Sequence, residues 1–119
     1  MAQITGRLTP EERMSFGRYA QELGLDGGTV ATLLLARELR VERLAELQQD
    51  RELIAIGSTP KTITSHRFPE PEKRKFTTYV AGLNLSASKA LGILCRAELS
   101  ERWLARAING QFDSIRVEH

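Results

Sequence analysis

The amino-acid sequence predicts a mainly α protein with a short two-stranded antiparallel ribbon and a four-helix core. Three observations support this fold class: a short alternating segment opens the chain, two helical segments follow it, and the same order returns 60 residues later. One such unit cannot cover its own apolar second helix, whereas two units can. The 119 residues are therefore expected to form a single compact domain.

The chain contains an internal repeat. Displacing the sequence by 60 residues aligns identical residues without a gap, which indicates a tandem duplication. The identical pairs include Arg7 with Arg67, Glu12 with Glu72, Phe16 with Phe76, Tyr19 with Tyr79, Leu34 with Leu94 and Glu38 with Glu98. The predicted segments are a first unit of residues 3–46, a linker of residues 47–61, a second unit of residues 62–108 and a tail of residues 109–119.

The opening strand of the first unit alternates between polar and apolar side chains, which face opposite sides of a strand. Ile4 and Leu8 are expected to point inward. The outward side chains are those of Gln3, Thr5 and Arg7. A strand of this length is not stable alone, so it is expected to pair with the strand of the second unit.

Residues 63–68 are the predicted partner strand. The same alternation, carried through the repeat, puts His66 and Phe68 on the inward side. It leaves Ser65 and Arg67 on the outward side. Both strands are therefore expected to carry an outward arginine.

The first helix of each unit is predicted directly after the strand. Thr9 and Glu12 fit a capping box, and Pro10 fits the first helical position, where its missing N–H costs nothing. Apolar residues then recur at three- and four-residue spacing, as in an amphipathic helix. Gly24 is expected to end this helix in a left-handed conformation, and Asn84 takes its place in the second unit.

The second helix of each unit is predicted to start at the N-caps Asp26 and Ser86. Residues 30–36 and 90–95 are apolar on most faces, which places these runs at the centre of the core. The later turns are expected to continue as an amphipathic helix. Their apolar residues are Leu39, Leu44, Leu99, Trp103, Leu104 and Ile108. In the linker, residues 53–56 either pack on the core or extend the preceding helix.

Charge and cysteine content indicate the cellular compartment and the kinds of partner to expect. The formal net charge is +2, but residues 61–105 carry eight basic and four acidic residues, whereas residues 1–45 are balanced. Cys95 is the only cysteine, which excludes an intrachain disulfide and fits a cytoplasmic setting. No apolar run reaches the ~18 residues of a membrane span, and no signal peptide is evident. No membrane partner is expected.

The sequence shows no pattern that is typical of an enzyme. It contains no Ser/His/Asp set, no phosphate loop and no inward pair of carboxylates. The two histidines, His66 and His119, give no metal-ligand spacing with Cys95. We therefore expect no catalytic residues, no metal site and no cofactor.

Four short segments resemble the ribbon-helix-helix family of DNA-binding proteins. They are residues 4–12 and Leu23-Gly24-Leu25-Asp26 in the first unit, with Arg67-Phe68-Pro69-Glu70 and Leu83-Asn84-Leu85-Ser86-Ala87-Ser88 in the second. The resemblance to these Arc- and MetJ-like proteins implies that the two strands form an antiparallel ribbon that enters the major groove. It also implies a single-chain pseudo-dimer, as in TraY-like accessory proteins of the conjugative relaxosome. Gly6 and His66 depart from the family pattern, which has an inward aliphatic residue there.

The outward side chains of the ribbon are the candidates for base contacts. They are Gln3, Thr5, Arg7, Ser65 and Arg67. The major groove presents a distinct pattern of donors and acceptors for each base pair, which glutamine reads at adenine and arginine at guanine. A single exposed arginine is ordinary, but an outward arginine on both strands favours DNA recognition.

The starts of the two second helices are the candidates for phosphate contacts, because their free N–H groups and the helix dipole attract anions. The candidates are Gly27, Gly28, Thr29, Ser86, Ala87, Ser88 and Lys89, together with Lys73 in the second unit. Asp26 opposes a phosphate by its charge, so the second unit is expected to bind phosphate more strongly. The charges of Lys73 and its basic neighbours are interpreted equally well as an ordinary solvated helix face.

We therefore expect the protein to bind double-stranded DNA sequence-specifically and to act as a transcriptional regulator. Further copies of the protein on adjacent DNA sites are a second expected partner. Two alternatives stay open. One is an accessory DNA-binding protein of plasmid conjugation, with a relaxase as partner. The other is an antitoxin with a toxin as partner. A helical dimerisation domain that has lost DNA binding is a third reading.

Overall fold

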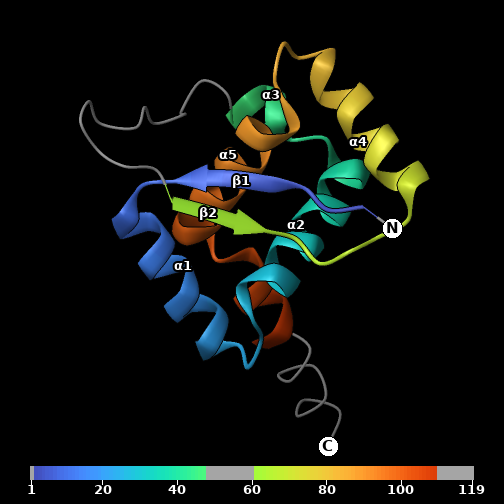
Figure 1. Cartoon of the computed structure of the whole chain (residues 1–119). Helices are drawn as coiled ribbons and strands as arrows, with labels where there is room; N and C mark the ends of the chain where they lie inside the picture. The colour runs from blue at the N-terminus through green and yellow to red at the C-terminus, as the bar shows by residue number, and fades with distance from the viewer. Residues whose placement is uncertain (1, 48–60, 110–119) are drawn as a thin grey trace, which may run out of the picture.

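The computed structural model describes residues 2–47 and 61–109. In this part of the chain a strand and its following helices occur twice in succession, consistent with two ribbon-helix-helix units (Figure 1). The elements are β1 (Thr5–Leu8), α1 (Pro10–Glu22), α2 (Gly27–Val41), α3 (Leu44–Leu47), β2 (Lys61–Thr64), α4 (Glu70–Ala81) and α5 (Ala87–Glu101). The predicted fold class, mainly α with a two-stranded antiparallel ribbon, is confirmed.

β1 and β2 pair antiparallel as predicted, but over a shorter and shifted span. Thr5 lies opposite Thr64, and Leu8 lies opposite Lys61 at the end of the ribbon. β2 therefore begins two residues before the predicted strand 63–68 and ends within it. Opposite residues of an antiparallel pair lie on the same face, so this register decides which side chains of β2 point outward.

The register reverses the predicted orientation of two side chains. Ser65 donates its backbone N–H to the carbonyl of the buried Ile4 at 2.9 Å and is itself only 1% exposed. Ser65 thus points inward and His66 is exposed, because a shift of one residue moves every side chain to the other face. Pairing resumes where Phe68 bridges to Ala2. The register of β1 and β2 would instead place Arg67 opposite Ala2, so the second strand contains one extra residue here, as in a β-bulge.

Each strand packs mainly on the second helix of the other unit. β1 lies across α5, and β2 lies against α2 (Figure 1). The buried apolar residues come from both strands and from all four long helices. They include Ile4, Leu8, Phe16, Val30, Ile63, Phe76 and Leu91. The apolar side of the ribbon is therefore covered only when both units are present.

β1 approaches α5 closely because both contact positions are glycines. A Cβ atom on Gly92 would lie 2.6 Å from the Arg7 carbonyl oxygen, and one on Gly6 would lie 3.0 Å from the Gly92 nitrogen. Real Cβ atoms essentially never approach other atoms to 2.6 Å. The departure of Gly6 from the family pattern therefore has a packing reason: an aliphatic side chain there would meet the helix backbone.

The second helix of each unit ends earlier than predicted. Glu42 and Arg102 take left-handed backbone angles, each with a φ of 51°. Such a residue stops a helix and redirects the chain. The chain continues as α3 in the first unit and as helical residues 103–109 in the second. The predicted unbroken amphipathic extension is therefore wrong.

Two predicted features, the apolar run of residues 53–56 and the tail beyond residue 109, lie outside the described residues. Within residues 2–47 and 61–109, no helix is long and apolar enough to cross a membrane.

Candidate nucleic-acid interface

The outer face of the ribbon is centred on two threonines. Thr5 and Thr64 lie opposite each other, and their Oγ1 atoms are hydrogen-bonded at 2.9 Å. Beside them, Arg7 lies opposite Thr62, and both of these residues are exposed. Thr5 and Arg7 thus point outward, as the alternation predicted.

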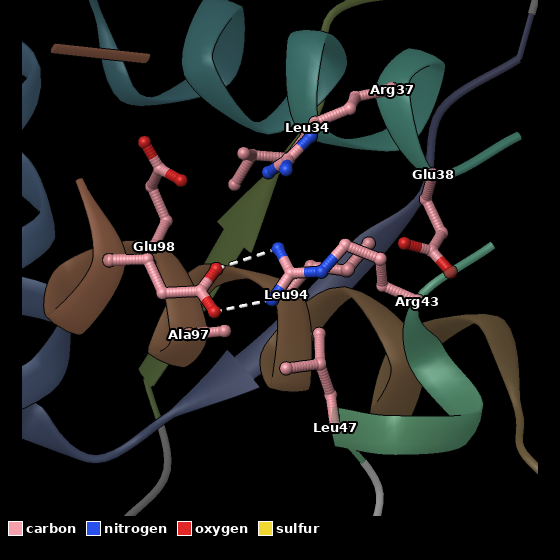
Figure 2. Close-up of a pocket in the computed structure, with 9 residues that line it drawn as sticks. Leu34, Arg37, Glu38, Arg43, Leu47, Leu94, Ala97 and Glu98 are labelled. Carbon is pink, nitrogen blue, oxygen red and sulfur yellow. Dashed lines mark hydrogen bonds and ion pairs between the residues drawn. The ribbon is translucent and has the colours of Figure 1, made fainter. Parts of the chain in front are cut away.

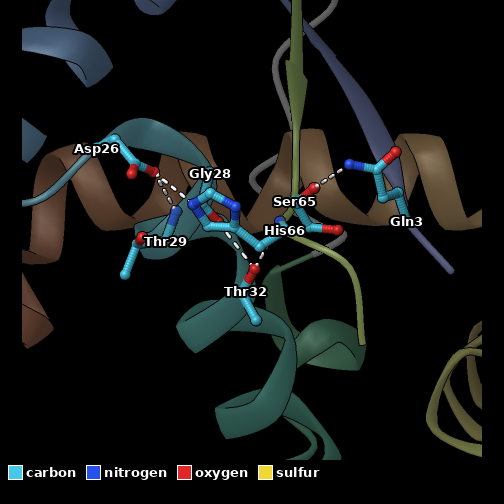
Figure 3. Close-up of polar contacts among 7 residues, drawn as sticks. All are labelled: Gln3, Asp26, Gly28, Thr29, Thr32, Ser65 and His66. Atoms are coloured by element: carbon cyan, nitrogen blue, oxygen red, sulfur yellow. Dashed lines mark hydrogen bonds and ion pairs between the residues drawn. The ribbon is translucent and has the colours of Figure 1, made fainter. Parts of the chain in front are cut away.

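The other end of this face carries an amide and an imidazole. Gln3 is exposed, and its Nε2 donates to the Ser65 carbonyl at 3.1 Å. His66 is also exposed, and its backbone N–H donates to Thr32 Oγ1 at 2.9 Å (Figure 3). The two ends of the ribbon face therefore differ in chemistry: arginine and threonine at one end, glutamine and histidine at the other.

Ser65 does not point to this outer face, contrary to the prediction. Its Oγ accepts the Ile4 N–H at 3.0 Å on the buried side of the ribbon. Arg67 is exposed, but it lies in the bulged step beyond β2 and not in the regular pairing. The outward positions of β2 belong to Thr62 and Thr64. The alternation of these threonines around an isoleucine was the signal that would have identified them.

The start of α2 is capped by the carboxylate of Asp26, which also contacts the imidazole of His66 (Figure 3). Asp26 Oδ1 accepts the Thr29 N–H at 2.7 Å and lies 2.8 Å from His66 Nε2. The Thr29 N–H, followed by the hydrogen bond with His66, lowers the pKa of Asp26 below its usual value. The carboxylate is therefore charged at neutral pH and competes with any phosphate for this helix start.

The two glycines at the start of α2 serve the packing of the ribbon. A Cβ atom on Gly27 would lie 2.8 Å from Ile63 Cδ1, and one on Gly28 would lie 3.0 Å from the Thr64 carbonyl oxygen. The absence of side chains lets β2 lie directly against the helix. These predicted phosphate contacts are therefore half-buried residues beside the ribbon.

The start of α5 carries more positive charge than the start of α2. Its N-cap is the neutral Ser86, whose Oγ accepts the Lys89 N–H at 3.1 Å. Lys89 is exposed, whereas Ala87 and Ser88 are half-buried. Lys73, on α4, is also half-buried. The stronger phosphate binding expected of the second unit stays a prediction.

Two buried carboxylates connect the units that carry the ribbon. Glu98 is 1% exposed and accepts hydrogen bonds from the Tyr19 hydroxyl and, at 2.8 Å, from the Leu104 N–H. Glu38 is 2% exposed and accepts the Tyr79 hydroxyl at 2.5 Å and a backbone N–H after the end of α2 at 2.7 Å. The expectation from the sequence that the chain has no inward pair of carboxylates is therefore wrong. The repeated tyrosine and glutamate at matching positions were the missed signal.

A further polar cluster lies between α2 and α5 (Figure 2). Its two arginines, Arg37 and Arg43, differ from the residues at the equivalent positions 60 residues away. The guanidinium of Arg43 is hydrogen-bonded to Glu101 through both terminal nitrogens, which lowers the pKa of the Glu101 carboxyl. Arg37 lies over the ring of Trp103, with its Cζ 4.2 Å from the ring centroid. The first unit supplies both arginines and the second unit supplies both partners, so the two halves are not interchangeable.

Comparisons of the chain with models of known protein families, with characterised proteins and with solved structures find no match. The case for a function therefore rests on the ribbon and the helix starts beside it.

Proposed function

We propose that the protein binds double-stranded DNA sequence-specifically by inserting the β1–β2 ribbon into the major groove, as ribbon-helix-helix proteins do, and that it regulates transcription. The observation that carries this proposal is the row of exposed hydrogen-bonding side chains along the outer face of a two-stranded ribbon. The major groove of B-DNA is wide enough for such a ribbon, and its base edges offer matching donors and acceptors.

The side chains of this face suit base edges. Arg7 has the two parallel donors that guanine accepts, and Gln3 has the donor and acceptor that adenine pairs with. Thr5 and Thr64 offer single hydrogen bonds and methyl groups for thymine. Arg67 is exposed beside the ribbon, so we assign it to a phosphate. Ser65 is buried and is not assigned to DNA.

Phosphate contacts position such a ribbon in the groove. We assign the stronger contact to the start of α5, where the neutral Ser86 cap and the exposed Lys89 leave the helix dipole unopposed. The start of α2 binds phosphate more weakly, because its N-cap, Asp26, is negatively charged and repels a phosphate, whereas Ser86 is neutral.

One alternative has specific support. An accessory protein of plasmid conjugation that docks a relaxase on one side of its site needs two unequal halves, and the contacts of Arg43 and Arg37 make the halves unequal. Among the described residues we find no feature that favours an antitoxin in the same way.

The experiment that tests the proposal begins with selection of binding sites from random double-stranded DNA. Affinities for the selected site are then measured by mobility shift for the wild type and for Arg7→Ala. We expect Arg7→Ala to lose about 10- to 100-fold, the size of one bidentate base contact. The affinity of the wild type is expected to fall steeply as salt rises.

Arg40→Ala is the matched control, because it removes the same charge from an exposed position in the last turn of α2. Its affinity for the selected site is expected to stay close to that of the wild type. The proposal fails if no DNA sequence is enriched, or if the two arginine variants bind equally well.

A further inference from the structure

The two halves of the molecule differ where the first helix of one unit meets the second helix of the other. Between α1 and α5, Arg96 Nε donates to Glu12 Oε2 at 2.5 Å and its Nη2 donates to Oε1 at 3.2 Å. The Thr9 N–H adds a third hydrogen bond at 2.8 Å. Partial burial raises the pKa of Glu12, but these donors outweigh it, and the pKa is lowered. The ionised carboxylate of Glu12 is therefore stabilised by three hydrogen bonds.

The equivalent position between α2 and α4 lacks the cation. Ala36 stands where the repeat has Arg96, and Pro69 stands where it has Thr9. Proline has no N–H to donate. Glu72, the counterpart of Glu12, instead contacts Lys75 of its own helix at 3.3 Å, where the side chain of Lys75 is 67% exposed and that of Glu72 is 44% exposed. A surface ion pair of this kind contributes little free energy. Another cation can therefore replace Lys75 at the Glu72 carboxylate at little cost.

A cavity of about 100 Å³ lies at this place. Leu35, Leu39, Phe68 and Phe76 form its apolar walls, and Glu72 lies at its margin. Each of these residues has a counterpart 60 residues away, and the counterpart of Glu72 is Glu12, which pairs with Arg96. An apolar cavity of about 150 Å³ is enough to bind benzene, so this one suits a short aliphatic chain.

We propose that this cavity binds a small organic cation, a guanidinium or ammonium group on a short aliphatic stem. The stem lies against Leu39 and Phe76, and the cation pairs with Glu72, in the way that Arg96 pairs with Glu12. The internal repeat provides the argument for this occupant, because in the other half the equivalent carboxylate, Glu12, pairs with the alkylguanidinium group of Arg96. The inference does not depend on DNA binding.

The test uses n-propylguanidine, which has the atoms of an arginine side chain beyond Cα, and n-propylurea, which has the same shape without the charge. Each is titrated into the full-length ¹⁵N-labelled protein while the backbone amide shifts of Thr32, Ala36 and Glu72 are followed. Saturable shifts are expected with the guanidine. The urea, and the guanidine with the Glu72→Gln variant, are expected to bind about two- to fivefold more weakly, because one partly exposed ion pair is lost.

Two variants fill the cavity from within. Ala36→Arg copies the other half and is expected to abolish binding, and Ala36→Leu is expected to do the same without adding charge. Glu12→Gln changes only the opposite half, and its affinity for the guanidine is expected to match that of the wild type. The proposal is overturned if no shift saturates, if urea and guanidine bind equally, or if Ala36→Arg still binds.

Discussion

The Tyr19 hydroxyl on α1 donates a hydrogen bond to the buried carboxylate of Glu98 on α5 and so joins the two units of the chain. Burial, followed by the hydrogen bond to Glu98, raises the pKa of Tyr19, so the hydroxyl keeps its proton. The same oxygen accepts the Ala105 N–H at 3.1 Å. Because a buried carboxylate without donors is costly, this bond favours the arrangement in which both units are docked.

Tyr19→Phe is predicted to destabilise the protein more than Tyr79→Phe. Tyr19 is 2% exposed, whereas Tyr79 is half-buried, so the hydrogen bond of Tyr19 to Glu98 is better shielded from water than that of Tyr79 to Glu38. We expect losses of about 2–3 and 1–2 kcal/mol in the free energy of unfolding. Urea denaturation followed by circular dichroism measures both. Equal losses would contradict the prediction that the deeper burial of Tyr19 strengthens its hydrogen bond.

Glu12→Gln is predicted to destabilise the protein at neutral pH but not in acid. The pKa of Glu12 is lowered from its usual 4.5, so the ionised carboxylate stabilises the fold above that pH. This stabilisation is lost as the pH falls through the folded-state pKa. We expect a loss of about 1–2 kcal/mol at pH 7 that shrinks toward about pH 3. Glu11→Gln, an exposed neighbour, is the control and should show no such trend.

Gly92→Ala is predicted to destabilise the contact between β1 and α5. The added Cβ would lie 2.6 Å from the Arg7 carbonyl oxygen, so the strand has to move. Overpacking of this kind costs about 1–3 kcal/mol. Gly17→Ala is the matched control, because its Cβ would meet only the guanidinium of Arg13, at an ordinary contact distance of 3.4 Å. Alanine in a helix is favoured over glycine by up to about 1 kcal/mol, so this control should melt at a higher temperature.

The DNA site that we propose for this protein is predicted to lack two-fold symmetry. On one side of the central threonine pair the ribbon carries Arg7 opposite Thr62, and on the other side it carries Gln3 and His66. A ribbon with unequal ends reads unequal half-sites. Sequencing of a selected pool should therefore give an asymmetric consensus. A palindromic consensus would contradict the assignment of these side chains.

The sequence by itself determined the elements and their order. The repeat set the number of units, and local chemistry set where the helices begin. The Thr9–Glu12 capping box and the Asp26 and Ser86 N-caps are confirmed. Gly24 is confirmed in the predicted left-handed conformation, as its counterpart in the second unit is. These features depend on residues a few positions apart, so the amino acids alone carry the information.

The tertiary structure decided the side-chain orientations on β2 and the contacts between units. Ser65 points inward because β2 pairs with β1 one residue out of step with the repeat, and a bulge then restores Phe68 to its place. Strand register depends on the partner strand and on the helix beneath it, here where Gly92 lets β1 approach α5. The pairing of Glu98 with Tyr19 likewise joins residues 79 positions apart. Such contacts exist only after both units have packed together, so a local pattern does not contain them.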